Sequence, residues 1–169
     1  FDQNAIEITE AKIDRFFEAY LERLSHFLPT DNPSPLPGVI DMITDMRRWL
    51  PTPAIGLLTG NHSKGAELKL RHYNIWHEFE MGSFGEKTTN RNTVAQEALS
   101  WARDRWKDIQ PGEILVIGDT DRDIQCARAI GARVLAVATG DSPIEELHAC
   151  NPDWASINLL RENLPKSWD

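Results

Sequence analysis

Two short polar segments follow apolar stretches of the chain, and the first has residue types that suit phosphate binding. Thr59-Gly60-Asn61 comes directly after the apolar stretch 54–58 and offers a hydroxyl, a flexible backbone and an amide. Such groups at the start of a helix can bind a phosphoryl oxygen. Taken alone, the tripeptide is better explained as a turn that leads into a helix N-cap. Its chemistry therefore depends on what lies beside it.

The second polar segment, Gly118–Asp123, carries three acidic residues within five positions. Asp119 and Asp123 are four residues apart at the start of a predicted helix. Grouped carboxylates repel one another, and a hard cation such as Mg²⁺ would relieve that repulsion. Capping of the helix by Asp119 or Thr120 is the alternative, with the remaining acids favoured by the helix dipole.

Two cations, Lys87 and Arg91, lie in the segment 82–92 between these two sites. In a loop they could lean over a bound anion, and an arginine could donate two parallel hydrogen bonds. As isolated residues they are typical of solvated surface charges.

The elements that must position these residues alternate between helices and short apolar strands. An amphipathic helix from about residue 10 to residue 24, with Thr9 as its N-cap, comes first. Strands are predicted at 54–58, 113–117, 133–138 and 154–157, with a weaker candidate at 78–81. Apolar strands separated by helices indicate an α/β fold with a parallel sheet flanked by helices on both faces. Since ligands bind at the carboxyl ends of such strands, the polar segments above should converge there.

Composition narrows the possible functions. The chain has 169 residues, 18 Lys and Arg against 26 Asp and Glu, and a formal charge of −8. The length suits one domain, and the acidic balance argues against nucleic acid as a partner. No apolar stretch reaches the roughly 20 residues that a membrane helix needs, so we expect no membrane partner. The two cysteines lack metal or redox spacing, which predicts a reducing compartment, the cytoplasm.

Together these motifs resemble the haloacid dehalogenase superfamily, in particular phosphoglycolate-phosphatase-like hydrolases with an α-helical cap. Leu57–Asn61 resembles the second motif of that family, which implies that Thr59, Gly60 and Asn61 bind the phosphoryl group. Val116–Ile124 resembles the fourth motif, which implies that Asp119 and Asp123 bind Mg²⁺. The resemblance also implies a Rossmann-like parallel core.

The third motif departs from the common pattern. Most members of the family have a Lys there, whereas this chain has Arg91 followed by Asn92, as in one subgroup. We expect Arg91 to supply the catalytic and phosphate-binding cation, with Lys87 as the alternative. Thr59 and Arg91 are therefore the predicted catalytic residues within this chain.

The first motif of the family, Asp-x-Asp-Gly-Thr/Val, is absent from this sequence. In the family it follows the first strand, which lies between the strands that carry the second and fourth motifs. We therefore expect this chain to be the C-terminal portion of a longer protein that also contains the missing N-terminal segment. The predicted organisation is a cap remnant at 1–32, a proline-rich hinge at 33–38 and, at 39–169, a hydrolase core without its first strand.

The resemblance implies a Mg²⁺-dependent phosphatase that hydrolyses a small phosphorylated metabolite through an aspartyl-phosphate intermediate. The attacking Asp would lie upstream of Phe1. Three alternatives stay open: a Mg²⁺-independent dehalogenase, a phosphomutase of the same superfamily, and a noncatalytic phosphate-binding protein. The last gains weight only if the protein begins at Phe1.

Overall fold

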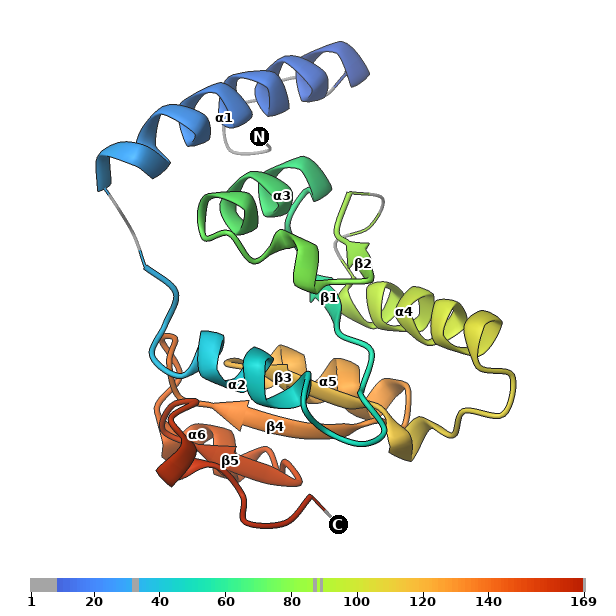
Figure 1. Ribbon diagram of the computed structural model, residues 1–169. Coiled ribbons are helices and arrows are strands. Elements are labelled where there is room, and N and C mark those ends of the chain that lie inside the picture. The colour runs from blue at the N-terminus through green and yellow to red at the C-terminus, as the bar shows by residue number, and fades with distance from the viewer. Residues whose placement is uncertain (1–8, 32–33, 87, 89, 169) are drawn as a thin grey trace.

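The computed structural model describes residues 9–31, 34–86, 88 and 90–168 (Figure 1). Its helices and strands are α1 (Glu10–Asp31), α2 (Val39–Met46), β1 (Gly56–Thr59), α3 (Ser63–His72), β2 (Met81–Phe84), α4 (Arg91–Arg105), β3 (Leu115–Gly118), α5 (Asp121–Ala129), β4 (Arg133–Val137), α6 (Ile144–Ala149) and β5 (Trp154–Ser156). Single-turn 3₁₀ helices lie at Trp76–Glu78, Pro111–Glu113 and Arg161–Asn163. From β1 onward strands and helices alternate, as predicted.

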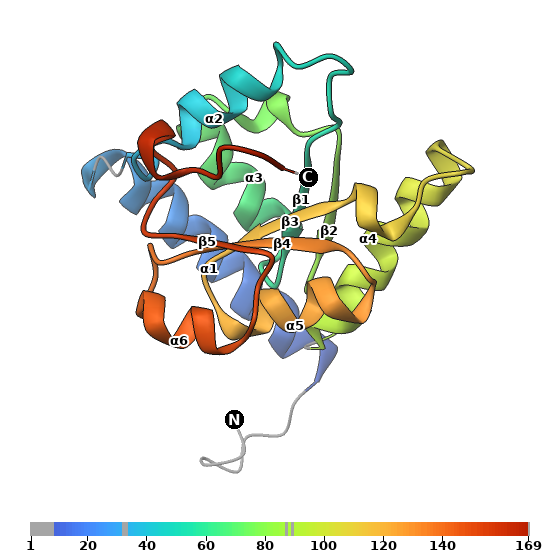
Figure 2. The same cartoon turned by 90° about the horizontal axis from the view of Figure 1, so that it is seen from below.

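The strands form two parallel sheets. β1 pairs with β2, so that Gly56 lies opposite Met81 and Thr59 opposite Phe84. Strands β3, β4 and β5 lie side by side with β4 in the centre (Figure 2). The predicted α/β class with parallel strands flanked by helices is confirmed. The strands nevertheless form two sheets rather than one, because among the described residues no strand pairs with the second edge of β1 or of β3.

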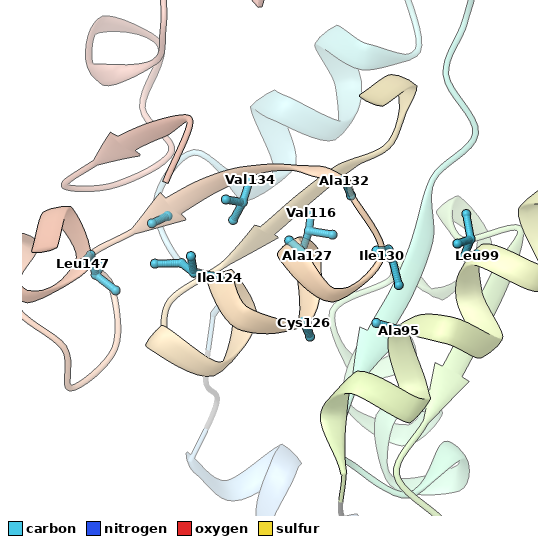
Figure 3. Close-up of a cluster of buried hydrophobic side chains, with 11 residues drawn as sticks. Ala95, Leu99, Val116, Ile124, Cys126, Ala127, Ile130, Ala132, Val134 and Leu147 are labelled. Carbon is cyan, nitrogen blue, oxygen red and sulfur yellow. The ribbon is translucent and has the colours of Figure 1, made fainter. Parts of the chain in front are cut away.

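The main hydrophobic core lies where α5 packs on β3 and β4 and where α4 packs on α5 (Figure 3). One face of α5 and alternate residues of β4 point into it, as the helical and strand periodicities require. Its buried members are Ala95, Leu99, Val116, Ile124, Cys126, Ala127, Ile130, Ala132, Val134, Ala136 and Leu147. This core fixes the position of the loop between β3 and α5, which contains the acidic segment.

A second cluster covers the other face of the three-stranded sheet. Leu135 and Val137, which alternate with the β4 residues of the main core, pack there against Met42 of α2. Trp154 and Trp168 complete the cluster from β5 and the C-terminal segment. β4 is therefore enclosed on both faces, as expected for the central strand of a parallel sheet.

Helix α1 lies alongside α3 (Figure 1). Thr9 precedes its first residue, in agreement with the predicted N-cap position, and its most buried residue is Leu28. Further along the chain, Gly38 adopts a positive φ of 88°, and a Cβ there would lie 2.2 Å from the backbone of Leu159. The chain therefore enters α2 through a close backbone contact that only glycine permits.

One predicted strand is displaced along the sequence. β2 occupies Met81–Phe84 rather than 78–81, because Trp76–Glu78 forms a 3₁₀ helix and occupies the start of the predicted strand. Gly82 and Ser83 carry no apolar signal, so their strand conformation was not evident from the sequence. In the described part of the chain no helix has the length and apolar character needed to cross a lipid bilayer.

Candidate phosphate-binding site

The loops after β1 and β2 are in direct backbone contact. The Thr59 hydroxyl accepts a hydrogen bond from the Asn61 amide at 3.1 Å, which closes a turn at the end of β1. The Gly85 amide donates to the Asn61 carbonyl at 3.1 Å. A Cβ on Gly85 would lie only 2.3 Å from the Gly60 carbonyl oxygen, so a glycine is required at this approach. The two loops therefore form one continuous wall.

Arg91 and Asp123 connect this wall to the acidic segment. Arg91 is the first residue of α4, where Asn90 forms the N-cap by accepting a hydrogen bond from the Asn92 amide at 2.9 Å. The Arg91 guanidinium donates to Asp123 Oδ1 and stands close to Gly60. Because the Asp123 carboxylate is buried, this ion pair is shielded from water on one side.

The second oxygen of Asp123 is also fully engaged. Asp123 Oδ2 accepts hydrogen bonds from the amides of Asp119 and Thr120, at 3.2 and 3.1 Å, and from the Thr120 hydroxyl at 2.7 Å. Thr120 in turn caps α5 by accepting from the Asp123 amide, so the two residues form a capping box. The helix-capping alternative raised from the sequence is therefore realised, with Thr120 as the N-cap residue and Asp123 as its partner.

The Asp119 carboxylate lies against Gly140, in the turn that follows β4. A Cβ on Gly140 would lie 2.4 Å from Asp119 Oδ2, so this carboxylate occupies space left open by a glycine. Among the described residues, no group of three or more His, Cys, Asp or Glu side chains could hold a metal ion. A Mg²⁺ ion needs only one or two protein carboxylates when water and phosphate complete its shell, and the Asp119 carboxylate fits that limited role.

Cys126 lies directly behind Asp123. Its Sγ donates a hydrogen bond to the Asp123 carbonyl at 3.2 Å, and the residue has no exposed surface. Burial raises the pKa of the Cys126 thiol, the nearby Asp123 charge raises it further, and Arg91 partly opposes the effect. The sulfur is therefore a neutral packing group rather than a nucleophile.

A polar cavity of about 700 Å³ opens between these elements. Its walls come from the loops after β1 and β2 and from the first turns of α4 and α5. They are formed by Thr59, Gly60, Asn61, Gly85, Thr88, Asn90, Arg91, Asn92, Val94, Arg122 and Gln125. The cavity is the size of a small-molecule site.

The structure brings most of the predicted site residues together. Thr59, Gly60, Asn61 and Arg91 line one cavity, although Arg91 follows Thr59 by 32 positions in the sequence. Asp123 contacts the cavity through its ion pair with Arg91. Asp119 is absent from the cavity wall, and Lys87, the alternative cation, lies outside the described residues.

Other residues of the cavity were not predicted. Arg122 and Gln125 project from α5, and Asn90 lies at the start of α4. The sequence offered one signal for Asn90, because an Asn directly before a predicted helix is typical of an N-cap. For Arg122 and Gln125 the sequence offered none, because their exposure to the cavity depends on how α4 and α5 pack.

Residues 1–137 match the family described as haloacid dehalogenase-like hydrolase. The chain belongs to this family. It is 29% identical, over 119 residues, to phosphoglycolate phosphatase from Synechococcus elongatus; the match covers 70% of this chain and 52% of that protein. The chain therefore spans about half the length of this haloacid dehalogenase-like relative.

Solved structures show the same fold. CbbY from Rhodobacter sphaeroides in complex with Xylulose-(1,5)bisphosphate superposes with a TM-score of 0.72 and 16% identity, over 90% of this chain and 67% of that one. A haloacid dehalogenase-like family protein from Streptococcus pneumoniae gives a TM-score of 0.61 and 22% identity, over 70% and 53% of the two chains. At these identities the comparison establishes the haloacid dehalogenase-like fold alone.

Proposed function

We propose that the protein containing this chain is a phosphatase that hydrolyses a small phosphorylated metabolite. The observation that carries the proposal is the convergence of Thr59, Asn61 and Arg91 on one polar cavity at the carboxyl ends of β1 and β2. Hydroxyl, amide and guanidinium donors together suit a phosphoryl dianion. The phosphatase relative named above supports the same reaction class.

The chain's own residues would bind and orient the phosphoryl group. The Thr59 hydroxyl accepts from the Asn61 amide, which leaves its proton free to donate to a phosphoryl oxygen. Arg91 gives one N–H to Asp123 and retains other donors on the side facing Gly60. Asp123 thereby fixes the direction of Arg91, and the preorganised cation would stabilise the charge that develops as the phosphoryl group transfers.

We further propose that Asp119 contributes to a Mg²⁺ site. Bound Mg²⁺ would neutralise phosphate charge during transfer. Because both oxygens of Asp123 are already hydrogen-bonded, Asp123 supports the site from behind by holding Arg91. Gly140 leaves the Asp119 carboxylate room beside the end of β4.

The organisation of the chain is also a proposal. We propose that residues 1–32 belong to a helical cap, 33–38 to a hinge, and 39–169 to a core whose first strand lies upstream. The edges of β1 and β3 that pair with no described strand support this arrangement. A strand between them would satisfy both sets of backbone groups. An Asp at the end of that strand would attack phosphorus, the ester oxygen would leave with a proton, and water would hydrolyse the aspartyl-phosphate.

The decisive experiment measures phosphate release by the whole protein from p-nitrophenyl phosphate, with Mg²⁺ and with a chelator. We expect Mg²⁺-dependent turnover, and Asp119→Asn should reduce it by at least about 100-fold. Asp121→Asn is the matched control, because its carboxylate is exposed and accepts a hydrogen bond from Gln125 Nε2 at 3.3 Å. Equal turnover in Asp119→Asn and the unaltered protein would refute the assignment of Asp119.

The same assay separates the alternatives. Halide release from a haloacid that is insensitive to the chelator would indicate a dehalogenase. Isomerisation of a sugar phosphate without net phosphate release would indicate a mutase. Binding of inorganic phosphate without any turnover would indicate a noncatalytic protein.

We propose a reducing compartment, the cytoplasm, for this protein. Cys126 and Cys150 are both free, and Cys126 is buried away from any partner thiol. Structural disulfides are rare in reducing compartments, which is consistent with two free thiols. Thiol counting on protein isolated under alkylating conditions tests the point, and a disulfide found there would contradict it.

A further inference from the structure

Helix α1 contacts the residue that follows the candidate phosphate-binding loop. The rings of Phe17 on α1 and His62, the residue directly after Asn61, lie 4.5 Å apart between centroids. One turn further along α1, Tyr20 covers Gly65 of α3, and a Cβ on that glycine would lie 3.0 Å from the tyrosine ring. The glycine therefore allows the two helices to approach closely.

The covered face of α1 is distinct from its exposed face. Phe17, Tyr20, Leu21, Leu24 and Leu28 are at least partly buried, and their spacing of three and four residues places them on one side of the helix. Phe27, near the C-terminal end of the same helix, is 54% exposed. The Phe17 ring is therefore held in its contact by the orientation of the whole helix.

His62 takes part in the polar contacts that hold the loop after β1, which carries Asn61. As the N-cap of α3, its Nδ1 accepts from the Lys64 amide at 3.3 Å. Nδ1 also lies 3.3 Å from Glu86 Oε1, which accepts from the Ser63 amide at 2.6 Å. Glu86 follows Gly85, whose amide holds the Asn61 carbonyl. A displacement of His62 would therefore loosen both loops that form the cavity wall.

We propose that Phe17 is a positioning residue: by packing on His62 it fixes the Asn61 loop, so that docking of α1 on α3 sets the affinity of the loop for a phosphoryl group. The inference rests on the proposed function only in assigning phosphate to this loop. Phe17 contacts no substrate in this scheme. It acts through the ring contact with His62 and the hydrogen bonds beyond it.

Titration with inorganic phosphate of the whole protein tests the proposal, alongside KM and kcat for p-nitrophenyl phosphate. Phe17→Ala should raise the phosphate dissociation constant and KM together by at least about fivefold, the lower end of typical coupling between sites. kcat should change by less than about twofold, as expected when uniform binding is lost. Phe17→Tyr, which keeps the ring, should restore both constants, and Phe27→Ala, which removes an exposed ring of the same helix, should change neither.

A double-mutant cycle distinguishes positioning from general destabilisation. His62→Ala should weaken phosphate binding about as much as Phe17→Ala. The double variant should have a phosphate dissociation constant no higher than that of the single variant that binds phosphate less tightly. Additive losses would overturn the proposed route through His62. Unaltered phosphate binding in Phe17→Ala would overturn the proposal outright.

Hydrogen exchange of the amides of residues 60–64 separates this inference from the proposed function. Phe17→Ala should reduce their protection, whereas unchanged protection would overturn the inference. If the unaltered protein bound phosphate without hydrolysing any ester, the proposed function would fail. The phosphate affinity of Phe17→Ala would then still decide this inference. If the unaltered protein bound no phosphate, both would fail.

Discussion

The two sheets of the molecule differ in how completely they are enclosed. In β4, at the centre of the three-stranded sheet, Val134, Leu135 and Ala136 have no exposed surface. None of the four residues Gly56–Thr59 of β1 is buried, and in β2 only Ser83 is, with 4% of its surface exposed. We call the two-stranded sheet with its loops the less enclosed half and the three-stranded sheet with α5 the more enclosed half. The candidate site joins them, because Thr59 lies in the less enclosed half and Asp123 in the more enclosed one. The less enclosed half should therefore open more readily.

Helix α4 connects the two halves. It packs on β1 and β2 and also on α5, and Leu58 of β1 extends from the less enclosed half to the main core. The Arg91–Asp123 ion pair adds a polar link between the halves at the site itself. Substitutions placed in each half can therefore test how far the two halves behave as separate units.

The largest effect is expected in the three-stranded half. Leu135→Ala should lower the free energy of unfolding by about 2–5 kcal/mol, because it leaves a cavity inside a fully enclosed strand. Leu58→Ala is the matched change in the two-stranded half. It should cost roughly 1–2 kcal/mol, since the side chain is only partly buried. Urea titrations of the two variants measure the difference, and equal costs would show that both halves are equally well packed.

The same difference explains which elements the sequence revealed. β4 was predictable from its continuous apolar residues, because a strand enclosed on both faces needs them. The predicted position of β2 was wrong, because Gly82 and Ser83 lack the apolar pattern that predicts a strand. Ile117 of β3 looked like a buried residue, yet it is 38% exposed on a strand that pairs with β4 alone among the described strands.

The candidate site was predictable only in part. Thr59, Asn61 and Asp119 follow apolar strands, and the rule that ligands bind at the carboxyl ends of parallel strands was enough to single them out. The pairing of Arg91 with Asp123 joins residues 32 positions apart, and only the packing of α4 against α5 decides it. The sequence therefore named both residues but gave no sign that they contact each other.

The second prediction tests the link between the loops of the less enclosed half. Gly85→Ala should cost about 1–3 kcal/mol, because the new Cβ would meet the Gly60 backbone, which cannot move without disturbing β1. Gly112→Ala is the control, since a Cβ there meets nothing within 4 Å, and its effect should stay within about 0.5 kcal/mol. Thermal unfolding of both variants measures the costs. Equal unfolding midpoints for Gly85→Ala and Gly112→Ala would show that the close approach of the two loops does not contribute to stability.

The smallest effect is a difference in thiol reactivity. Exposed Cys150 should react with iodoacetamide near pH 8.5, whereas Cys126 should react only when the main core opens. Burial and the Asp123 charge raise the pKa of Cys126, so the folded state retains its proton at pH values where the unfolded chain releases it. Stability from this group is therefore present below the ordinary thiol pKa and is lost as pH rises beyond it.

Cys126 labelling then reports on the opening of the main core. Leu135→Ala should speed the reaction of Cys126, because it destabilises β4, whose opposite face forms part of the core that encloses the sulfur. Gly85→Ala should leave that rate close to its original value if the two-stranded half opens independently. Mass spectrometry of quenched samples follows both cysteines, with Cys150 as the internal reference. A Gly85→Ala variant that speeds Cys126 labelling as much as Leu135→Ala would show that α4 makes the two sheets a single cooperative unit.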